Sequence, residues 1–368
     1  MTMVGTRPEI IRLSRVIARL DESFEHALVH TGQNWDPKLS DVFFDEMKIR
    51  RPDVNLGVDV SSLGASIAGV IAGTERVIHQ YSPDAFLVLG DTNSALGLIM
   101  AKRMRIPTYH MEAGNRCFDE NVPEETNRRI VDHTADFNLV YTEHARRNLL
   151  AEGLHPRRIL LTGSPMREVL DFYRSDIEAS SVLSALGLDE GEYFIVSAHR
   201  EETVDSPARL QRLVAALDAV AERWRLPIVV SVHPRTRKRM RELGVEPNDS
   251  RVHLMEPFGF LDYNKLQLSS RCALSDSGTI SEESAILGFP AVTLRASIER
   301  PEALDTASII MADVQTGEVI PSIDLALSGQ RQRMCPVDYT VSNTSERVVN
   351  FIQSTAPLHA TWASLRPV

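Results

Sequence analysis

The sequence predicts an α/β protein with two Rossmann-like domains, each a doubly wound parallel sheet covered by helices, facing one another across a cleft. Short β-branched runs alternate with longer amphipathic stretches, and this alternation occurs in two series. The 368 residues also exceed the roughly 150 residues of one typical domain. Ligands of such sheets bind beyond the carboxyl ends of the strands, so the residues that follow each strand are the candidates for function.

The first series begins with a short strand that ends before Gly5 and continues with predicted strands at 26–31, 85–90, 107–111, 137–141 and 158–162. The second series comprises 193–198, 227–232, 272–275 and 290–294. The clearest helix is 207–223, because Ser206 can cap it, Pro207 suits its first position and apolar residues recur along one face.

A polar helical stretch, 166–190, separates the two series and contains no strand pattern. We therefore expect an N-terminal domain over residues 1–164, carrying the acidic groups discussed below, and a C-terminal domain over residues 165–345. The tail, 346–368, contains nearly all of an apolar-periodic segment, SERVVNFIQS. We expect this segment to form a helix that packs back on the first domain.

Composition and charge exclude several classes of protein. No apolar run approaches the roughly 18–20 residues that span a bilayer, and the N-terminus lacks the pattern of a secretory signal. The three cysteines, Cys117, Cys272 and Cys335, are scattered, which favours a reducing compartment and disfavours a structural zinc site. We expect a cytoplasmic protein that binds no membrane. The net charge of −10 also disfavours a nucleic-acid partner.

Three acidic residues follow strands or begin a helix in the first domain. Asp91 follows strand 85–90, Glu112 follows strand 107–111, and Glu124 comes directly after Pro123 at a helix start. We expect them at one rim, where paired carboxylates can serve as acid and base. Each also has a structural interpretation: Asp91 as a helix cap, Glu112 as a partner of Arg116, and Glu124 as a residue favoured by the helix dipole.

Cationic groups occupy similar positions. Arg7 follows the first strand at a helix N-terminus, where backbone N–H groups and a guanidinium could bind a phosphate, although a capped helix start with a solvated arginine is the favoured interpretation of this segment alone. His199 and His233 follow two strands of the second series. Such histidines suit a diphosphate or proton transfer, whereas a lone histidine is more often structural.

The segment 276–283, DSGTISEE, joins a strand to a helix through small residues. Ser277, Gly278 and Thr279 could direct hydroxyl and N–H donors at a phosphate, and Glu283 could accept hydrogen bonds from ribose hydroxyls. A capping box of Thr279 and Glu282 would explain the helix start alone. The glycine patterns of Rossmann dehydrogenases and P-loop NTPases are absent.

At these residues the sequence resembles the non-hydrolysing UDP-N-acetylglucosamine 2-epimerase family, over nearly the whole chain. The motifs that carry the resemblance are GTRPE (5–9), GDTNS (90–94), HMEAGNR (110–116), PEETNR (123–128), TGSP (162–165), SAHREE (197–202), DSGTISEES (276–284) and ERPEAL (299–304). Three further segments, FDENVPEETNRRIVDH, PFGFLDYNKLQ and DYTVSNTSERVV, look closest to a branch from surface-polysaccharide clusters. That branch includes enzymes acting on UDP-2-acetamido-2,6-dideoxy-L-hexoses, at the L-talose to L-fucosamine step.

The resemblance implies a fold similar to B-type glycosyltransferases and inversion of the sugar at C2. UDP is eliminated to give a 2-acetamidoglycal and then adds back, with the proton returned to the other face; no cofactor or metal is needed. The acid–base and critical positions match Asp91, Glu112, Glu124 and His199. The implied substrate contacts are Arg7, Arg128, His199 and His233 on the diphosphate, Ser277, Gly278 and Thr279 on phosphate oxygens, Glu283 on ribose, Tyr263 near uracil, and Arg12, which stands where many members have lysine.

The leading hypothesis is an isomerase that interconverts UDP-N-acetylglucosamine and UDP-N-acetylmannosamine in polysaccharide or aminosugar biosynthesis. A close alternative uses a UDP-2-acetamido-2,6-dideoxy-L-hexose by the same mechanism. Different classes are a retaining glycosyltransferase, a non-catalytic nucleotide-sugar sensor and a hydrolysing epimerase. The expected partners are the UDP-N-acetylhexosamine and UDP, and the resemblance suggests a homodimer.

Overall fold

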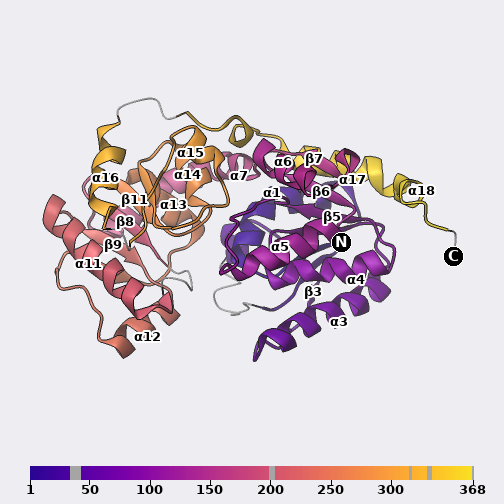
Figure 1. Cartoon of the computed structure of the whole chain (residues 1–368), viewed down its shortest axis with the longest axis horizontal. Coiled ribbons are helices and arrows are strands. Elements are labelled where there is room, and N and C mark those ends of the chain that lie inside the picture. The colour runs from indigo at the N-terminus through magenta and orange to yellow at the C-terminus, as the bar shows by residue number, and fades with distance from the viewer. Residues whose placement is uncertain (34–42, 199–203, 315–316, 330–333, 367–368) are drawn as a thin grey trace. The chain divides into compact units, whose positions relative to one another are not determined.

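The computed structural model describes residues 1–33, 43–198, 204–314, 317–329 and 334–366. The chain divides into two compact units (Figure 1). Unit 1 comprises Met1–Asp171 and Val337–Val368, and unit 2 comprises Phe172–Pro336. Unit 1 thus resumes after unit 2, and its two segments are longer than the expected 1–164 and 346–368. No helix in the described part of the chain has both the length and the apolar character needed to cross a membrane.

The described residues of unit 1 form a seven-stranded parallel sheet in the order β3-β2-β1-β4-β5-β6-β7. The strands are β1 (Thr2–Val4), β2 (Leu28–His30), β3 (Val54–Asn55), β4 (Phe86–Leu89), β5 (Thr108–Met111), β6 (Phe137–Val140) and β7 (Ile159–Leu161). The strand order changes direction between β1 and β4: β2 and β3 lie on one side of β1, and β4 to β7 lie on the other. The loops after β1 and β4 therefore lie at the position where doubly wound sheets bind ligands.

Helices and short 3₁₀ turns connect these strands. The helices of unit 1 are α1 (Arg7–Ser23), α3 (Leu63–Tyr81), α4 (Gly97–Arg103), α5 (Pro123–Thr134), α6 (Glu143–Ala151), α7 (Met166–Phe172), which crosses the boundary, α17 (Thr344–Thr355) and α18 (His359–Trp362). The 3₁₀ turns are η1 (Asn93–Leu96), η2 (Pro156–Arg158), η3 (Val337–Tyr339) and η4 (Ala356–Leu358). Ser62 and Thr142 cap α3 and α6 by accepting backbone N–H bonds.

The described residues of unit 2 form a six-stranded parallel sheet in the order β10-β9-β8-β11-β12-β13, which reverses between β8 and β11. The strands are β8 (Phe194–Ser197), β9 (Ile228–Ser231), β10 (Val252–Met255), β11 (Cys272–Ser275), β12 (Ala291–Thr293) and β13 (Ile310–Met311). Its helices are α8 (Arg174–Ala179), α9 (Val182–Leu186), α11 (Pro207–Trp224), α12 (Pro234–Leu243), α13 (Phe260–Ser269), α14 (Ile280–Leu287), α15 (Glu302–Asp305) and α16 (Val319–Ser328).

The predicted fold class is confirmed, as are the predicted strands and the helix that begins at Pro207. Helix α11 is capped by the Ser206 side chain, and its apolar face, including Leu210, Leu217 and Val220, lies in a buried core beneath the sheet. Strands β3, β10 and β13 were not predicted. β3 and β13 have two residues each, and β10 is a short run, VHLM, with a histidine inside it.

The C-terminal segment returns to unit 1, where α17 packs against α1 (Figure 1). The Thr355 hydroxyl lies 2.8 Å from the Tyr109 hydroxyl. The ring of Phe351 meets that of Phe137 edge-on, with centroids 5.3 Å apart. These contacts join the last helices to the strands β5 and β6 of the same sheet.

Candidate functional site

Three loops meet at the carboxyl end of β1 in unit 1. A Cβ at Gly5 would overlap the hydroxyl oxygens of Ser94 and Thr31, so the loops after β1, β2 and β4 approach here more closely than any other residue would permit. The Ser94 Oγ also donates to Gln33 at 3.3 Å. This close approach brings the start of α1 beside the turn that carries Asp91.

Asp91 is held by an arginine from a different element. Arg128, on α5, directs two guanidinium nitrogens at Asp91 Oδ2, with Nη2 at 2.6 Å and Nε at 3.1 Å. The Asn127 side chain donates to the Asp91 carbonyl oxygen at 3.0 Å. Asp91 is only partly buried, so its carboxylate is both fixed in direction and accessible to a ligand.

Glu112 forms a second buried ion pair, with Nη1 of Arg12 on α1. The Glu112 backbone has φ of +62°, a left-handed conformation that is uncommon for a residue with a side chain. A Cβ at Gly90 would lie 3.9 Å from Glu112 Oε2, so this carboxylate lies beside the turn that precedes Asp91. The structure thus brings Asp91, Glu112, Arg12 and Arg128 to one edge of the sheet.

A further acid, Glu9, lies buried beneath this edge. Its Oε2 accepts hydrogen bonds from the backbone N–H groups of Gly5 at 2.5 Å and Thr6 at 3.1 Å, and its Oε1 accepts one from the Thr92 hydroxyl. Burial raises the pKa of Glu9 to about 7, although these donors act in the opposite direction. Glu9 therefore ties the start of α1 to the residue after Asp91. It belongs to the motif GTRPE, in which sequence reasoning identified no role for it.

Glu124 and Arg7 lie in first helical turns of unit 1. Glu124 is exposed on α5, whereas its neighbour Glu125 is buried and accepts a hydrogen bond from Arg128 Nη1 at 2.6 Å. Burial acts to raise the pKa of Glu125, but Arg128 and other donors outweigh it and hold the pKa below its usual value. Arg7 is half-buried and its guanidinium lies 5.1 Å from the ring centroid of Phe43. Sequence reasoning did not identify Glu125 as a partner of Arg128.

In unit 2, residues 277–279 form a tight turn between β11 and α14. The Ser277 and Thr279 hydroxyl oxygens lie 2.9 Å apart, and the Thr279 N–H donates to Ser277 Oγ at 3.3 Å. Arg300 donates from Nη1 to the Gly278 carbonyl oxygen at 2.6 Å. A Cβ at Gly278 would come within 2.5 Å of that nitrogen, so any other residue here would displace the Arg300 guanidinium.

Glu283 and Tyr263 lie near the same turn. Gln267, on α13, donates to Glu283 Oε2 at 2.8 Å, and Glu283 is buried. Burial raises the pKa of Tyr263, with the nearby Glu283 charge adding to it, while the Ser197 and Ser275 hydroxyls hydrogen-bond to its phenol and lower it. The Tyr263 hydroxyl is thus directed at the ends of β8 and β11, so the polar end of this side chain faces the turn.

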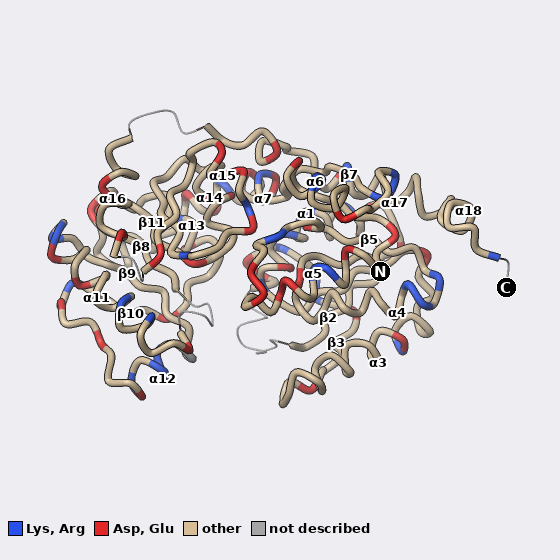
Figure 2. The backbone as a smooth tube through the Cα atoms, viewed as in Figure 1, with Lys and Arg blue, Asp and Glu red and all other residues tan. Residues whose placement is uncertain are grey.

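Of the two histidines predicted for the site, His199 and His233, the structure describes only His233. His199 lies outside the described residues. His233 follows β9, directly before α12, and its side chain is exposed. The basic segment of α12 is visible in Figure 2, where Lys and Arg are otherwise interspersed with Asp and Glu along both units.

Sequence reasoning missed two arginines of unit 2. Arg295, after β12, forms a buried pair of hydrogen bonds with Glu299, each of 2.6 Å. Its Nη1 would lie 3.9 Å from a Cβ at Gly278. Arg300 also pairs with the buried Glu282, at 3.2 Å from Nε to Oε2. The motif ERPEAL contains Glu299 and Arg300 and was the available signal, but nothing in the sequence placed it beside residues 277–279.

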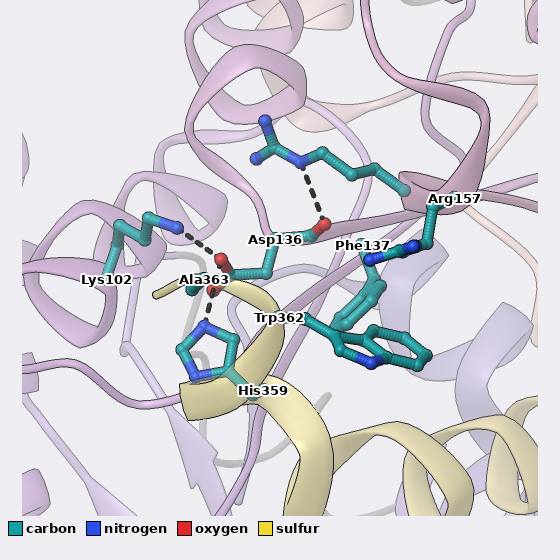
Figure 3. A pocket seen from close by; sticks show the side chains of 8 residues that line it. Lys102, Asp136, Phe137, Arg157, His359, Trp362 and Ala363 are labelled. Carbon is teal, nitrogen blue, oxygen red and sulfur yellow. Dashed lines mark hydrogen bonds and ion pairs between the residues drawn. The ribbon is translucent and has the colours of Figure 1, made fainter. Parts of the chain in front are cut away.

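A pocket of about 260 Å³ lies elsewhere in unit 1 (Figure 3). It is lined in part by Asp136, which directly precedes β6. Asp136 therefore lies at the amino ends of the parallel strands, whereas Asp91 lies at their carboxyl ends. Figure 3 shows Asp136 between Lys102 of α4 and His359 of α18, and both form ion pairs with it. The Arg157 guanidinium lies 5.1 Å from the ring centroid of Trp362. These contacts anchor the C-terminal helix to the sheet.

Among the described residues, no group of three or more His, Cys, Asp or Glu side chains is placed to hold a metal ion. The polar groups at both switch points are instead carboxylates paired with arginines, hydroxyls and backbone donors. Such a set can exchange protons and bind phosphate oxygens.

A model of the family described as UDP-N-acetylglucosamine 2-epimerase matches residues 18–353. A UDP-N-acetylglucosamine 2-epimerase structure from Rickettsia bellii is 40% identical, with a TM-score of 0.91 and 98% of each chain covered. That of Methanocaldococcus jannaschii in complex with UDP-GlcNAc and UDP is 30% identical, with a TM-score of 0.90, and the match covers 96% of this chain and 99% of that one.

A further relative differs in the sugar that its name specifies. The UDP-2,3-diacetamido-2,3-dideoxy-D-glucuronate 2-epimerase of Pseudomonas aeruginosa is 32% identical over 89% of this chain and 92% of its own. The glycosyltransferase WaaG shares the fold alone, at 14% identity and a TM-score of 0.61, over 95% of this chain and 98% of its own. The fold is therefore that of B-type glycosyltransferases, as the resemblance implied.

Proposed function

The chain belongs to the UDP-N-acetylglucosamine 2-epimerase family, and we propose that it interconverts UDP-N-acetylglucosamine and UDP-N-acetylmannosamine without net hydrolysis. The observation that carries this proposal is the pair of strand-end acids in unit 1. Asp91 and Glu112 follow adjacent strands, and each is held by an arginine from a different helix. Two carboxylates fixed side by side supply the two proton-transfer groups that inversion at a carbon needs.

The proposed reaction balances without any redox step. One group removes the C2 proton while the C1–O bond to UDP breaks, which leaves a C1=C2 double bond in the 2-acetamidoglycal and free UDP in the site. UDP then adds back at C1, and a second group returns a proton to the opposite face of C2. We assign the proton transfers to Asp91, Glu112 and Glu124, without distinguishing the face on which each acts, and add His199 from the family motif.

Unit 2 supplies the groups proposed to bind UDP. The hydroxyls of Ser277 and Thr279 and the N–H groups of the turn 277–279 suit phosphate oxygens. Glu283, oriented by Gln267, suits the ribose hydroxyls, and Tyr263 the uracil. Arg300 is bonded to the carbonyl oxygen of Gly278 and so supports this turn. Arg7, Arg12, Arg128 and His233 complete the proposed set, stabilising negative charge that develops on the departing diphosphate.

A second candidate substrate is a UDP-2-acetamido-2,6-dideoxy-L-hexose. The segment FDENVPEETNRRIVDH supports it by resemblance to that branch, and the Pseudomonas aeruginosa relative is named for a sugar other than N-acetylglucosamine. Both substrates use the same C2 chemistry and differ at other positions of the sugar, including the hydroxyl on C6. We further propose a cytoplasmic homodimer.

Proton NMR in deuterium oxide tests the proposal. Purified protein is incubated separately with UDP-N-acetylglucosamine, UDP-N-acetylmannosamine and the 6-deoxy-L-sugar nucleotides, with no acceptor added. We expect loss of the C2 proton signal and growth of the epimer from one substrate pair. Accumulation of UDP with a free sugar would instead indicate a hydrolysing enzyme. No turnover of any nucleotide sugar would contradict an epimerase and favour a sensor or an acceptor-dependent transferase.

A further inference from the structure

The imidazole of His110 is buried inside unit 1, and both of its nitrogens face oxygen acceptors. Nε2 lies 2.8 Å from the carbonyl oxygen of Gly90, and Nδ1 lies 2.9 Å from Oδ1 of Asp132. A carbonyl oxygen carries no hydrogen, so Nε2 must be the donor in the first contact.

Asp132 also contacts two further residues. Its oxygens accept hydrogen bonds from the backbone N–H of Gly114, at 3.1 and 3.2 Å, and from Arg116 Nη1, at 2.7 Å. Asp132 and Arg116 form an ion pair in which neither side chain is exposed to solvent. Glu152 supplies the second negative charge, paired with Arg116 through two nitrogens at 2.7 and 2.8 Å.

One branch of this cluster leads to Asp91. The acceptor of the His110 Nε2 bond is Gly90, which adopts φ of +73° in the turn between β4 and Asp91. The Gly90 N–H is bonded to the Met111 carbonyl oxygen at 3.0 Å. Both backbone polar groups of Gly90, its N–H and its C=O, are therefore held by residues of β5, and the direction in which Asp91 leaves the sheet depends on them.

The other branch leads to Glu112. Its left-handed backbone conformation is unfavourable for an L-residue and persists only where neighbours impose it. Two residues later, Gly114 has φ of +80° and donates its N–H to Asp132. Arg116, bonded to Asp132 and to the Asn115 carbonyl oxygen at 2.8 Å, fixes the end of the same turn. Asp132 is thus the shared anchor of both acid-bearing turns.

We infer that His110 and Asp132 are positioning residues for the reaction: His110, held by Asp132, sets the Gly90 turn before Asp91 through its Nε2 bond, and Asp132 with Arg116 sets the strained turn that carries Glu112. The inference rests on the proposed function, in which Asp91 and Glu112 exchange protons with C2. Neither His110 nor Asp132 touches substrate in this account. Their shared anchor keeps the two carboxylates in a fixed relation, which proton removal and return on one carbon both need.

Two substitutions of His110 separate its two bonds. The amide nitrogen of glutamine replaces Nε2 and can keep the bond to Gly90, whereas that of asparagine replaces Nδ1 and can keep only the bond to Asp132. We expect kcat to fall about tenfold to a hundredfold in His110→Asn and by less in His110→Gln. KM and the affinity for UDP should stay unchanged in both, because neither bond of His110 reaches a group proposed to bind UDP. His79→Gln, at an exposed histidine of α3, is the matched control and should leave kcat unchanged.

Any other order of kcat among folded variants overturns the inference, including equal rates for His110→Asn and His110→Gln. A uniform loss of folded protein would lower kcat without separating the two variants, so thermal unfolding of each is measured alongside. If the wild-type protein epimerises no nucleotide sugar, the proposed function fails, and the kinetic arm loses its reaction.

A direct measurement on the wild-type protein needs neither substrate nor a stable variant. With ¹⁵N-labelled histidine, NMR should show Nε2 of His110 carrying hydrogen, with slow exchange because the ring is buried. His79→Gln and the His110 variants assign the signals. An Nε2 without hydrogen would contradict the inferred bond to Gly90, whatever the activity of the enzyme.

Discussion

Arg128 contacts Asp91 through two nitrogens on a single oxygen, Oδ2, at 2.6 and 3.1 Å. The same guanidinium reaches Glu125 through its remaining terminal nitrogen, Nη1, at 2.6 Å. Arg128 therefore joins an accessible acid to a buried one. This arrangement fixes the direction of the Asp91 carboxylate.

The first prediction concerns this guanidinium. Arg128→Lys keeps the charge but removes the planar group that spans Asp91 and Glu125. We expect kcat to fall about tenfold to a hundredfold, because Asp91 loses its orientation. Steady-state kinetics of epimerisation measures this. Arg147→Gln, at an exposed arginine of α6, should leave kcat unchanged. A normal kcat in Arg128→Lys would show that Asp91 needs no such orientation.

The second prediction concerns Glu9, whose pKa burial raises from near 4.5 to about 7. Between these values the folded protein keeps a proton that the unfolded chain has lost, so the free energy of unfolding falls as pH rises through this window. The slope is about 1.4 kcal/mol per pH unit at most. Glu9→Gln should remove this dependence, whereas Glu22→Gln, at an exposed glutamate of α1, should retain it. Denaturant unfolding at pH 5, 6, 7 and 8 measures the slopes, and parallel curves for all three proteins would be the contrary result.

The third prediction concerns the anchor of the C-terminal helix. Burial acts to raise the pKa of Asp136, but hydrogen bonds from His359 and Lys102 outweigh it and hold the pKa below its usual value. The resulting stability is present above about pH 4 and is lost as pH falls below that value. Asp136→Asn should lower the free energy of unfolding by about 2 kcal/mol at pH 7 and make it less sensitive to acid.

Asp324→Asn serves as the control, because Asp324 lies in an exposed ion pair of unit 2. Its effect should stay within about 0.5 kcal/mol. Equal stability of Asp136→Asn and the wild-type protein at pH 7 would show that α18 is held by its aromatic contacts alone.

The sequence was most informative where a single local pattern sufficed. The position of Asp91 after β4 and the start of α11 at Pro207 both follow from a run of apolar residues and the residues beside it. Short strands such as β3 and β13 lack such a run. Their pairing depends on a neighbouring strand that already exists, so no local signal marked them.

The partners within the candidate site could not be predicted in the same way. Arg12 and Glu112 are 100 positions apart, and Arg128 and Asp91 are 37 apart. Their pairing is set by the order of strands in the sheet, which the sequence does not state. The contacts of His110 could not be predicted either. This residue lies inside a strand, where a histidine is more often structural, and only the structure shows the two acceptors around its ring.

The central claim is that the strand-end acids of unit 1 exchange protons with C2. Deuterium incorporation at C2, followed by NMR in deuterium oxide for the wild-type protein, Asp91→Asn and Glu112→Gln, tests it most directly, with UDP affinity measured for each. We expect rapid exchange in the wild-type protein, a loss of about a hundredfold to ten-thousandfold in each variant, and unchanged UDP binding. Wild-type exchange rates in both variants would contradict the account.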